Sequence, residues 1–336
     1  MANVTFIQQA APVDEYGRAL YAVARSIVRA MLDQLAPDDL GDLNADIDQI
    51  TLRQLSKVAR LERDKGMRGD GFEWAIHEAI LGGEPRVVDR ISEVLRSASR
   101  RMDGSNPTSL LFGHERAKYL GFLEAVIQQA GEEAAILPDS RGHPYAFGPW
   151  VALAARGKEA ERLLTRRIEQ IWKTDLFLTD RDATKYIAAT IKSNHRQLEA
   201  GRGLRVGIVP EAKDLPPGIH RRESLWIVSL PDPNGFMGLF NDAYAAVAQA
   251  VCTLGKHERP PYFLKPSATA QRVQEQLEKY PTARAADIVA ALDEAAQQDL
   301  IDVQQRLLSV KPPPWLHMTE KEAPVIAPKP TFEKLD

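Results

Sequence analysis

The sequence has little cysteine and no apolar run long enough to cross a membrane. Its single cysteine, Cys252, excludes a disulfide framework and a cysteine-rich zinc site. The most apolar long stretch, 243–254, is about a dozen residues long and contains Gln249, whereas a membrane-spanning helix needs about 20 apolar residues. The N-terminus lacks a basic start followed by an apolar run, so no signal peptide is expected. These absences predict a cytoplasmic protein that does not associate with a membrane.

The motifs of three common classes of site are also absent. No serine lies in a G-x-S-x-G elbow, which argues against a serine hydrolase of that kind. The seven histidines show no paired ligand spacing, so the sequence does not predict a histidine-based zinc site. The glycine-rich stretch 201–207 opens a predicted strand, whereas a nucleotide loop follows a strand and opens a helix. We therefore interpret this stretch as a turn.

The charge distribution is uneven although the net charge is only −3. Residues 1–50 contain eight acidic and three basic side chains, whereas residues 141–230 contain sixteen basic and ten acidic ones. A basic middle region favours a polyanionic partner, because phosphates that bind Lys and Arg release their counterions. Solvated helix faces would produce similar clusters, so charge alone supports nucleic acid only weakly.

The spacing of apolar residues divides the chain into a helical first half and a second half that contains strands. Helical periodicity predicts helices at 13–35, 51–66, 71–82, 85–100, 115–133 and 157–171. Alternating periodicity then predicts strands at 172–179, 185–194, 204–210 and 224–230. A helix at 236–254 and two shorter helices within 267–309 complete the pattern.

These elements predict an α+β protein with a small mixed sheet flanked by helices and with a helical N-terminal region. The helical region spans 1–135 and includes an acidic helix at 71–82. A core at 136–265 contains the hairpin 172–194, and C-terminal helices occupy 266–310. The proline-rich residues 311–336 are expected to form a flexible tail.

The hairpin carries the strongest functional signal. Centring its polar turn at 182–183 pairs Leu178 with Ile187 and Leu176 with Ala189, which gives one continuous apolar face. A shift of one residue would bury the polar side chains, so the apolar pattern fixes this register.

The opposite face of the hairpin combines a carboxylate, a hydroxyl and an ammonium group. In the predicted register, Asp175, Thr190 and Lys192 all project from this face. The order of Asp175 and Thr190-x-Lys192 resembles the PD-(D/E)xK phosphodiesterase superfamily, which has the restriction-endonuclease-like fold. Asp175 matches the family's aspartate and Lys192 its lysine. Thr190 stands where a second carboxylate is usual, and Thr174 replaces the usual proline.

The resemblance covers about 71–82 and 172–230, and it implies metal-dependent hydrolysis of phosphodiester bonds in nucleic acid. DNA is the expected substrate, and bacterial restriction or phage defence is the implied role. Asp175 would bind Mg²⁺ or Mn²⁺ through oxygen, and Lys192 would position the attacking water and stabilise the developing charge.

The hydroxyl of Thr190 binds Mg²⁺ less well than a carboxylate, so the predicted metal site needs another acid. Glu73 lies at the edge of the apolar face of the helix 71–82 and is the preferred second ligand, whereas Glu78 is expected to point further towards solvent. Glu161 or Glu169 would be the alternative, and Glu73 as an ordinary solvated residue is equally compatible with the pattern.

The side chains near the hairpin suggest contacts with phosphates, and the partner assignments follow from the resemblance. The expected nucleic-acid-binding residues are Asn194, His195, Arg196, Arg202 and Arg205, although each also suits an ordinary surface position. A homodimer or a partner subunit of a defence system is also expected. The main alternative is a catalytically inactive subunit with the same fold that binds nucleic acid or takes part in an assembly, and a helical interaction protein is a further one.

Overall fold

The computed structural model describes residues 15–61, 66–98, 102–116, 118–119, 121, 173–181, 186–198, 205–223, 225–232, 235–258 and 264–297. Several predictions concern residues outside these ranges: most of the helix 115–133, the helix 157–171 with its alternatives Glu161 and Glu169, Arg202, and the tail 311–336. None of the helices in the described ranges is long and apolar enough to span a bilayer.

The described part of the chain confirms the α+β prediction, with a six-stranded mixed sheet and helices around it. The strand order is β1-β2-β3-β4-β6-β5. The pairs β1–β2, β2–β3 and β5–β6 are antiparallel, whereas β3–β4 and β4–β6 are parallel. The strands are β1 (Thr108–Leu111), β2 (Leu176–Thr179), β3 (Ile187–Ile191), β4 (Arg205–Pro210), β5 (Gly218–Arg222) and β6 (Leu225–Leu230).

Both edge strands were missed by the sequence analysis. β1 has only four residues, which is too short for alternation to stand out, and β5 has the polar sequence GIHRR. An edge strand pairs on one side only and often carries charge, so it lacks the apolar pattern that identifies a central strand. The strand predicted at 172–179 also begins later, at Leu176.

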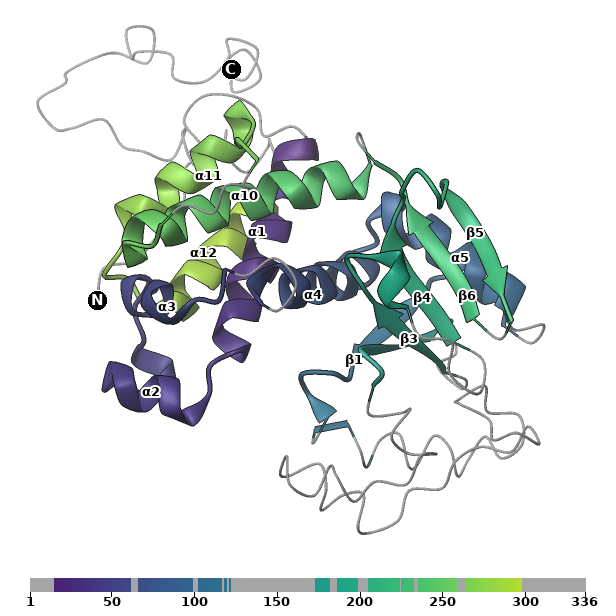
Figure 1. The fold of residues 1–336 in the computed structure, drawn as a ribbon, viewed down its shortest axis with the longest axis horizontal. Coiled ribbons are helices and arrows are strands. Elements are labelled where there is room, and N and C mark those ends of the chain that lie inside the picture. The colour runs from purple at the N-terminus through teal and green to yellow at the C-terminus, as the bar shows by residue number, and fades with distance from the viewer. Residues whose placement is uncertain are drawn as a thin grey trace, which may run out of the picture.

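Most predicted helices of the described regions are present. They are α1 (Glu15–Asp33), α3 (Leu52–Val58), α4 (Met67–Leu81), α5 (Pro85–Ala98), α10 (Phe236–Gly255), α11 (Ala268–Lys279) and α12 (Ala285–Gln297). The helix α2 (Pro37–Leu43) was not predicted, because seven residues are too few for helical periodicity to stand out. α3 is shorter than the predicted helix 51–66. It ends at Val58, and the next residue, Ala59, has an extended backbone. α1, α10, α11 and α12 gather on one side of the molecule, and α4 extends from this group towards the sheet (Figure 1).

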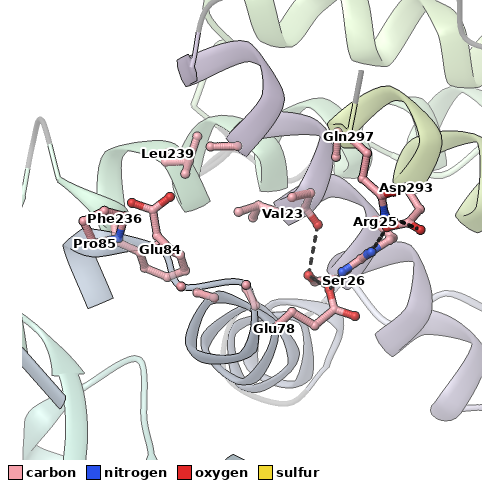
Figure 2. A pocket seen from close by; sticks show the side chains of 17 residues that line it. Val23, Arg25, Ser26, Glu78, Glu84, Pro85, Phe236, Leu239, Asp293 and Gln297 are labelled. Atoms are coloured by element: carbon pink, nitrogen blue, oxygen red, sulfur yellow. Dashed lines mark hydrogen bonds and ion pairs between the residues drawn. The ribbon is translucent and has the colours of Figure 1, made fainter. Parts of the chain in front are cut away.

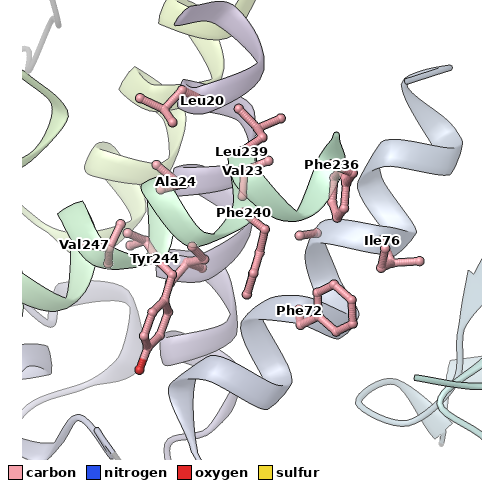
Figure 3. Close-up of a cluster of buried hydrophobic side chains, with 14 of the residues drawn as sticks. Leu20, Val23, Ala24, Phe72, Ile76, Phe236, Leu239, Phe240, Tyr244 and Val247 are labelled. Atoms are coloured by element: carbon pink, nitrogen blue, oxygen red, sulfur yellow. The ribbon is translucent and has the colours of Figure 1, made fainter. Parts of the chain in front are cut away.

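α4 is buried on more than one side, and this position decides where its polar side chains end up. Phe72 packs against Phe236 and Phe240 of α10, with ring centroids 6.5 and 5.0 Å apart (Figure 3). On the α1 side, a Cβ on Gly71 would lie 3.2 Å from Ile27, so glycine permits this close approach. One apolar core unites the helices with the inner face of the sheet.

Candidate functional site

The register of the hairpin matches the prediction. Leu178 pairs with Ile187 and Leu176 with Ala189, and all four side chains are part of the core. The parallel neighbour β4 continues the ladder, because the backbone N–H of Lys192 donates to Ile208 at 3.1 Å. The apolar face thus fixes the hairpin in the core and leaves the polar face at one end of β3.

Asp175 is held firmly at the start of this hairpin. Its Oδ2 accepts hydrogen bonds from Thr190 Oγ1 at 3.0 Å, from the backbone N–H of Ile191 at 2.6 Å and from Lys192 Nζ at 3.1 Å. Its backbone carbonyl accepts from the N–H groups of Phe112 and Gly113 at 2.9 and 2.8 Å. The carboxylate therefore has a defined orientation, and Thr190 acts as a donor that helps to set it.

Glu73 reaches the same group from α4. Its Oε1 lies 4.0 Å from Lys192 Nζ, and its Oε2 lies 3.2 Å from His114 Nε2. The sequence places Glu73 and Asp175 about a hundred residues apart, yet the structure brings both carboxylates to one ammonium group. The four residues predicted as catalytic, Glu73, Asp175, Thr190 and Lys192, therefore lie together.

A polar pocket of about 250 Å³ opens beside this cluster. The first turns of α4 form one wall through Gly69, Asp70 and Glu73, and residues 191–193 form the other. The lining is completed by Gln34, Arg60, Gly66 and Gln197. A group bound in this pocket would thus meet both carboxylate and cationic side chains.

The electrostatics of the cluster are dominated by its buried acids. Burial, followed by the nearby Asp175 carboxylate, raises the pKa of Glu73 to about 7, although His114 and Lys192 oppose this increase. Burial acts to lower the pKa of Lys192, but Asp175 and Glu73 outweigh it and raise that pKa above its usual value. Burial likewise acts to lower the pKa of His114, and the hydrogen bond and charge of Glu73 raise it overall. Negative charge is therefore in excess at this end of α4.

Two further residues of the cluster were not predicted from the sequence. Asp70, Glu73 and His114 each offer a ligand atom, and these atoms all lie within 4.8 Å of one another. Asp70 precedes Glu73 by three residues, and this helical spacing would have been sufficient to find it. His114 follows the short edge strand β1, so no sequence pattern connects it with α4.

Glu78 does not point towards solvent as predicted. Its side chain is only 9% exposed and accepts hydrogen bonds from Arg25 Nε at 3.3 Å and from Ser26 Oγ, and Arg29 Nη1 lies 3.5 Å away. The prediction assumed a single buried face for α4, but α1 covers this side of the helix.

Glu78 and Arg25 also line a second pocket, of about 370 Å³, among α1, α4, α10 and α12 (Figure 2). Its lining includes the apolar side chains of Val23, Phe236 and Leu239. Arg25 is already paired with Glu78 and with Asp293 of α12. The charged groups in this pocket therefore join helices to one another.

The predicted nucleic-acid-binding residues fall into different environments. The Asn194 side chain caps a short 3₁₀ helix, η3 (His195–Gln197), by accepting from the N–H of Arg196 at 3.0 Å. His195 and Arg196 both lie beside Asp214, at 3.3 and 3.1 Å, with Arg196 exposed.

The position of Arg205 contradicts the prediction that this side chain contacts a phosphate. It is only 5% exposed and lies in β4, between Ala188 of β3 and Leu225 of β6. A phosphate in solution would not reach a side chain that is buried in this way.

No family model, curated protein or solved structure matches the chain. The resemblance to the PD-(D/E)xK superfamily therefore stays a prediction that depends on Asp175, Lys192 and their neighbours.

Proposed function

We propose that this protein is a metal-dependent nuclease of the restriction-endonuclease-like fold that hydrolyses phosphodiester bonds in DNA. The observation that carries this proposal is the convergence of two carboxylates on one ammonium group. Lys192 Nζ lies 3.1 Å from Asp175 Oδ2 and 4.0 Å from Glu73 Oε1, beside a polar pocket. Residues from α4 and from the hairpin meet there although they are far apart in the sequence.

The residues present fit a hard divalent cation. The carboxylates of Asp70, Glu73 and Asp175 gather around a single lysine, and oxygen ligands of this kind suit Mg²⁺ and Mn²⁺. Asp175 and Glu73 would hold the ion. When bound, it would polarise the phosphate and lower the pKa of a water molecule.

The chain's own groups have separable roles in this proposal. Lys192 would donate to the attacking water or to a phosphate oxygen and stabilise the charge that develops on phosphorus. Thr190 is a positioning residue, because its hydroxyl donates to Asp175. Glu73 would supply the carboxylate that is missing at position 190. Asn194, His195 and Arg196 follow Lys192 closely in the chain and would contact a nucleic-acid backbone.

The hydroxyl at position 190 also favours a second candidate function. Because Thr190 and Lys192 both donate to Asp175, the chain's own donors already satisfy this carboxylate, as expected of a subunit that keeps the fold without catalysis. Such a subunit would bind nucleic acid, or take part in an assembly such as a homodimer or a defence system.

Cleavage assays test the proposal. We expect Mg²⁺ or Mn²⁺ to support cleavage of at least one of plasmid DNA, linear duplex DNA, single-stranded DNA and RNA. Asp175→Ala, Lys192→Ala and Glu73→Gln should each lower the rate by roughly 100-fold or more. Lys279→Ala, at an exposed position on α11, is the control and should leave the rate unchanged.

Two results would contradict the proposal. Cleavage that persists in Asp175→Ala and Lys192→Ala would point to a contaminant or to another site, and no cleavage by the folded wild type would favour the inactive subunit. Thr190→Glu separates a weak enzyme from an inactive one, because the restored carboxylate should increase the metal affinity and the rate of an active site only.

A further inference from the structure

The two oxygens of the Glu73 carboxylate face different partners. Oε1 is directed at Lys192, which belongs to the cluster around Asp175, whereas Oε2 is directed at His114 Nε2 at 3.2 Å. Asp70, Glu73 and His114 each offer one ligand atom, and these three atoms lie within 4.8 Å of one another. The His114 side therefore contains an imidazole nitrogen and two carboxylate oxygens that converge on one point.

We propose that Asp70, Glu73 and His114 form a binding site for a divalent transition-metal ion, of which Mn²⁺ and Zn²⁺ are representative. This site lies next to Asp175 and shares Glu73 with the proposed nuclease site, but its ability to bind a metal ion does not require nuclease activity.

The type of ligand selects the type of metal. Mg²⁺ is bound almost entirely by oxygen, whereas an imidazole nitrogen together with carboxylates suits Mn²⁺, Fe²⁺, Co²⁺ and Zn²⁺. Three protein ligands also leave coordination positions open for water or for a ligand oxygen. We therefore expect this site to discriminate against Mg²⁺.

The surroundings hold the ligands in place and leave a route for the ion. Gln34, just beyond the end of α1, donates its side-chain N–H to Asp70 Oδ2 and so orients that carboxylate. The Trp74 ring packs 6.2 Å from the His114 ring. Asp70 and Glu73 line the polar pocket, so an ion can reach them from solvent. Such supporting contacts are what a metal site needs beyond its ligands.

An ordinary ion pair between His114 and Glu73 accounts for only part of this arrangement. Such a pair needs one carboxylate, but Asp70 and Asp33 also lie close enough to act on His114 electrostatically. Lys192 and Arg29 compensate part of this charge, but Asp175 adds a fourth carboxylate. A divalent cation would offset the negative charge that remains.

Metal binding to the purified, metal-free, full-length chain tests the inference without reference to catalysis. Calorimetric titrations with Mn²⁺, Zn²⁺ and Mg²⁺ should show tighter binding of Mn²⁺ and Zn²⁺ than of Mg²⁺. His114→Gln and Asp70→Asn should each weaken Mn²⁺ binding by at least about tenfold. His77→Gln is the matched control, because it removes a buried histidine of α4, the helix that carries Asp70 and Glu73, and this histidine hydrogen-bonds Ser109 at 2.8 Å.

A spectroscopic readout identifies the nitrogen ligand directly. Pulsed electron paramagnetic resonance of bound Mn²⁺ should show coupling to a ¹⁴N nucleus in the wild type and in His77→Gln, and none in His114→Gln. Circular dichroism establishes that each variant is folded. If His114→Gln does not fold, Asp70→Asn and the wild-type spectrum carry the test.

The inference and the proposed nuclease function can fail separately. Three results would overturn this site even if the protein cleaved DNA. They are nitrogen coupling that persists in His114→Gln, equal affinity of the wild type for Mg²⁺ and Mn²⁺, and no binding of Mn²⁺ and Zn²⁺ by the wild type. Conversely, Mn²⁺ binding that depends on His114, in a protein that cleaves no nucleic acid, would keep the site and refute the nuclease.

Discussion

Two glutamates of α4, only five residues apart, occupy opposite kinds of environment. Glu78 faces α1, where Arg25, Arg29 and Ser26 all contact its carboxylate. Glu73 faces the end of the sheet, where Asp175 lies nearby and a single lysine is 4.0 Å away. Both side chains are largely buried, at 9% and 14% exposure.

The difference lies in how well each negative charge is compensated. A buried carboxylate that receives several charge-assisted hydrogen bonds stabilises the fold, because its lost hydration is replaced. A buried carboxylate next to other carboxylates is costly, and such costs are concentrated at sites where a protein binds or transforms something. Burial alone therefore does not distinguish a structural acid from a functional one, whereas the balance of neighbouring charges does.

Replacement of Glu78 should have the largest effect on stability. Glu78→Gln leaves Arg29 without this carboxylate and Arg25 with Asp293 alone, so the ion pairs between α1 and α4 are lost. We expect the free energy of unfolding to fall by about 3 kcal/mol, at the lower end of the range for breaking a buried ion pair, because Arg25 and Arg29 are 22% and 47% exposed. Urea denaturation measures this change.

The control for that measurement is Glu93→Gln on α5. Glu93 pairs with Arg90 at 3.2 Å but is 50% exposed, so its loss should change the free energy of unfolding by less than about 0.5 kcal/mol. A loss at Glu78 as small as that at Glu93 would refute the structural role of Glu78.

Replacement of Glu73 should act in the opposite direction. Its pKa is about 7 in the folded protein, against 4.5 for an unperturbed glutamate. Between these pH values the folded state binds the proton more tightly than the unfolded state does, so the stability contributed by this residue is lost as the pH rises through 7. Glu73→Gln cannot ionise, and it should raise the free energy of unfolding at pH 8 by about 2 kcal/mol.

That measurement should be made with a chelator present, so that no metal ion compensates the carboxylates. The gain should shrink towards pH 4.5, where the wild-type carboxyl group is protonated in the folded state. Equal stabilities of wild type and Glu73→Gln at pH 8 would mean that Lys192 and His114 already neutralise this site.

The sequence was sufficient to predict the hairpin but not the surroundings of α4. The alternation of Leu176, Leu178, Ile187 and Ala189 fixed the register, and the register placed Asp175 beside Thr190 and Lys192. These are local consequences of a period of two. The relation of Glu73 to the hairpin was a hypothesis that required the resemblance, because no local pattern connects the two.

The environment of Glu78 and the position of His114 depend on packing between distant segments. Periodicity assigns one buried face to a helix, but α4 is covered by α1 on one side and contacts β1 on another. The apolar residues of α4 therefore do not show which acid is paired. The role of His114 could not be predicted for the same reason. Its neighbours Asp70 and Glu73 belong to a helix about forty residues earlier in the chain.

His77, also on α4, should have a smaller effect on the free energy of unfolding than Glu78 or Glu73, and its effect should depend on pH. Burial lowers the pKa of His77 from 6.5 to about 4, and its ring hydrogen-bonds Ser109. As the pH falls from 7 to 5.5, the unfolded chain takes up a proton at this residue and the folded protein does not. The contribution of His77 to the free energy of unfolding should therefore decrease by about 1 kcal/mol, opposite in sign to the change at Glu73 over the same range.

Urea denaturation of the wild type and of His77→Gln at both pH values isolates the contribution of His77 to the free energy of unfolding, because the two proteins share all their other titrating groups. The wild type should lose about 1 kcal/mol more than His77→Gln on acidification. If both proteins lost the same amount, His77 would be protonated in the folded state at pH 5.5. The burial of His77 would then not keep its ring neutral, and the contrast with Glu73, whose pKa burial raises, would be lost.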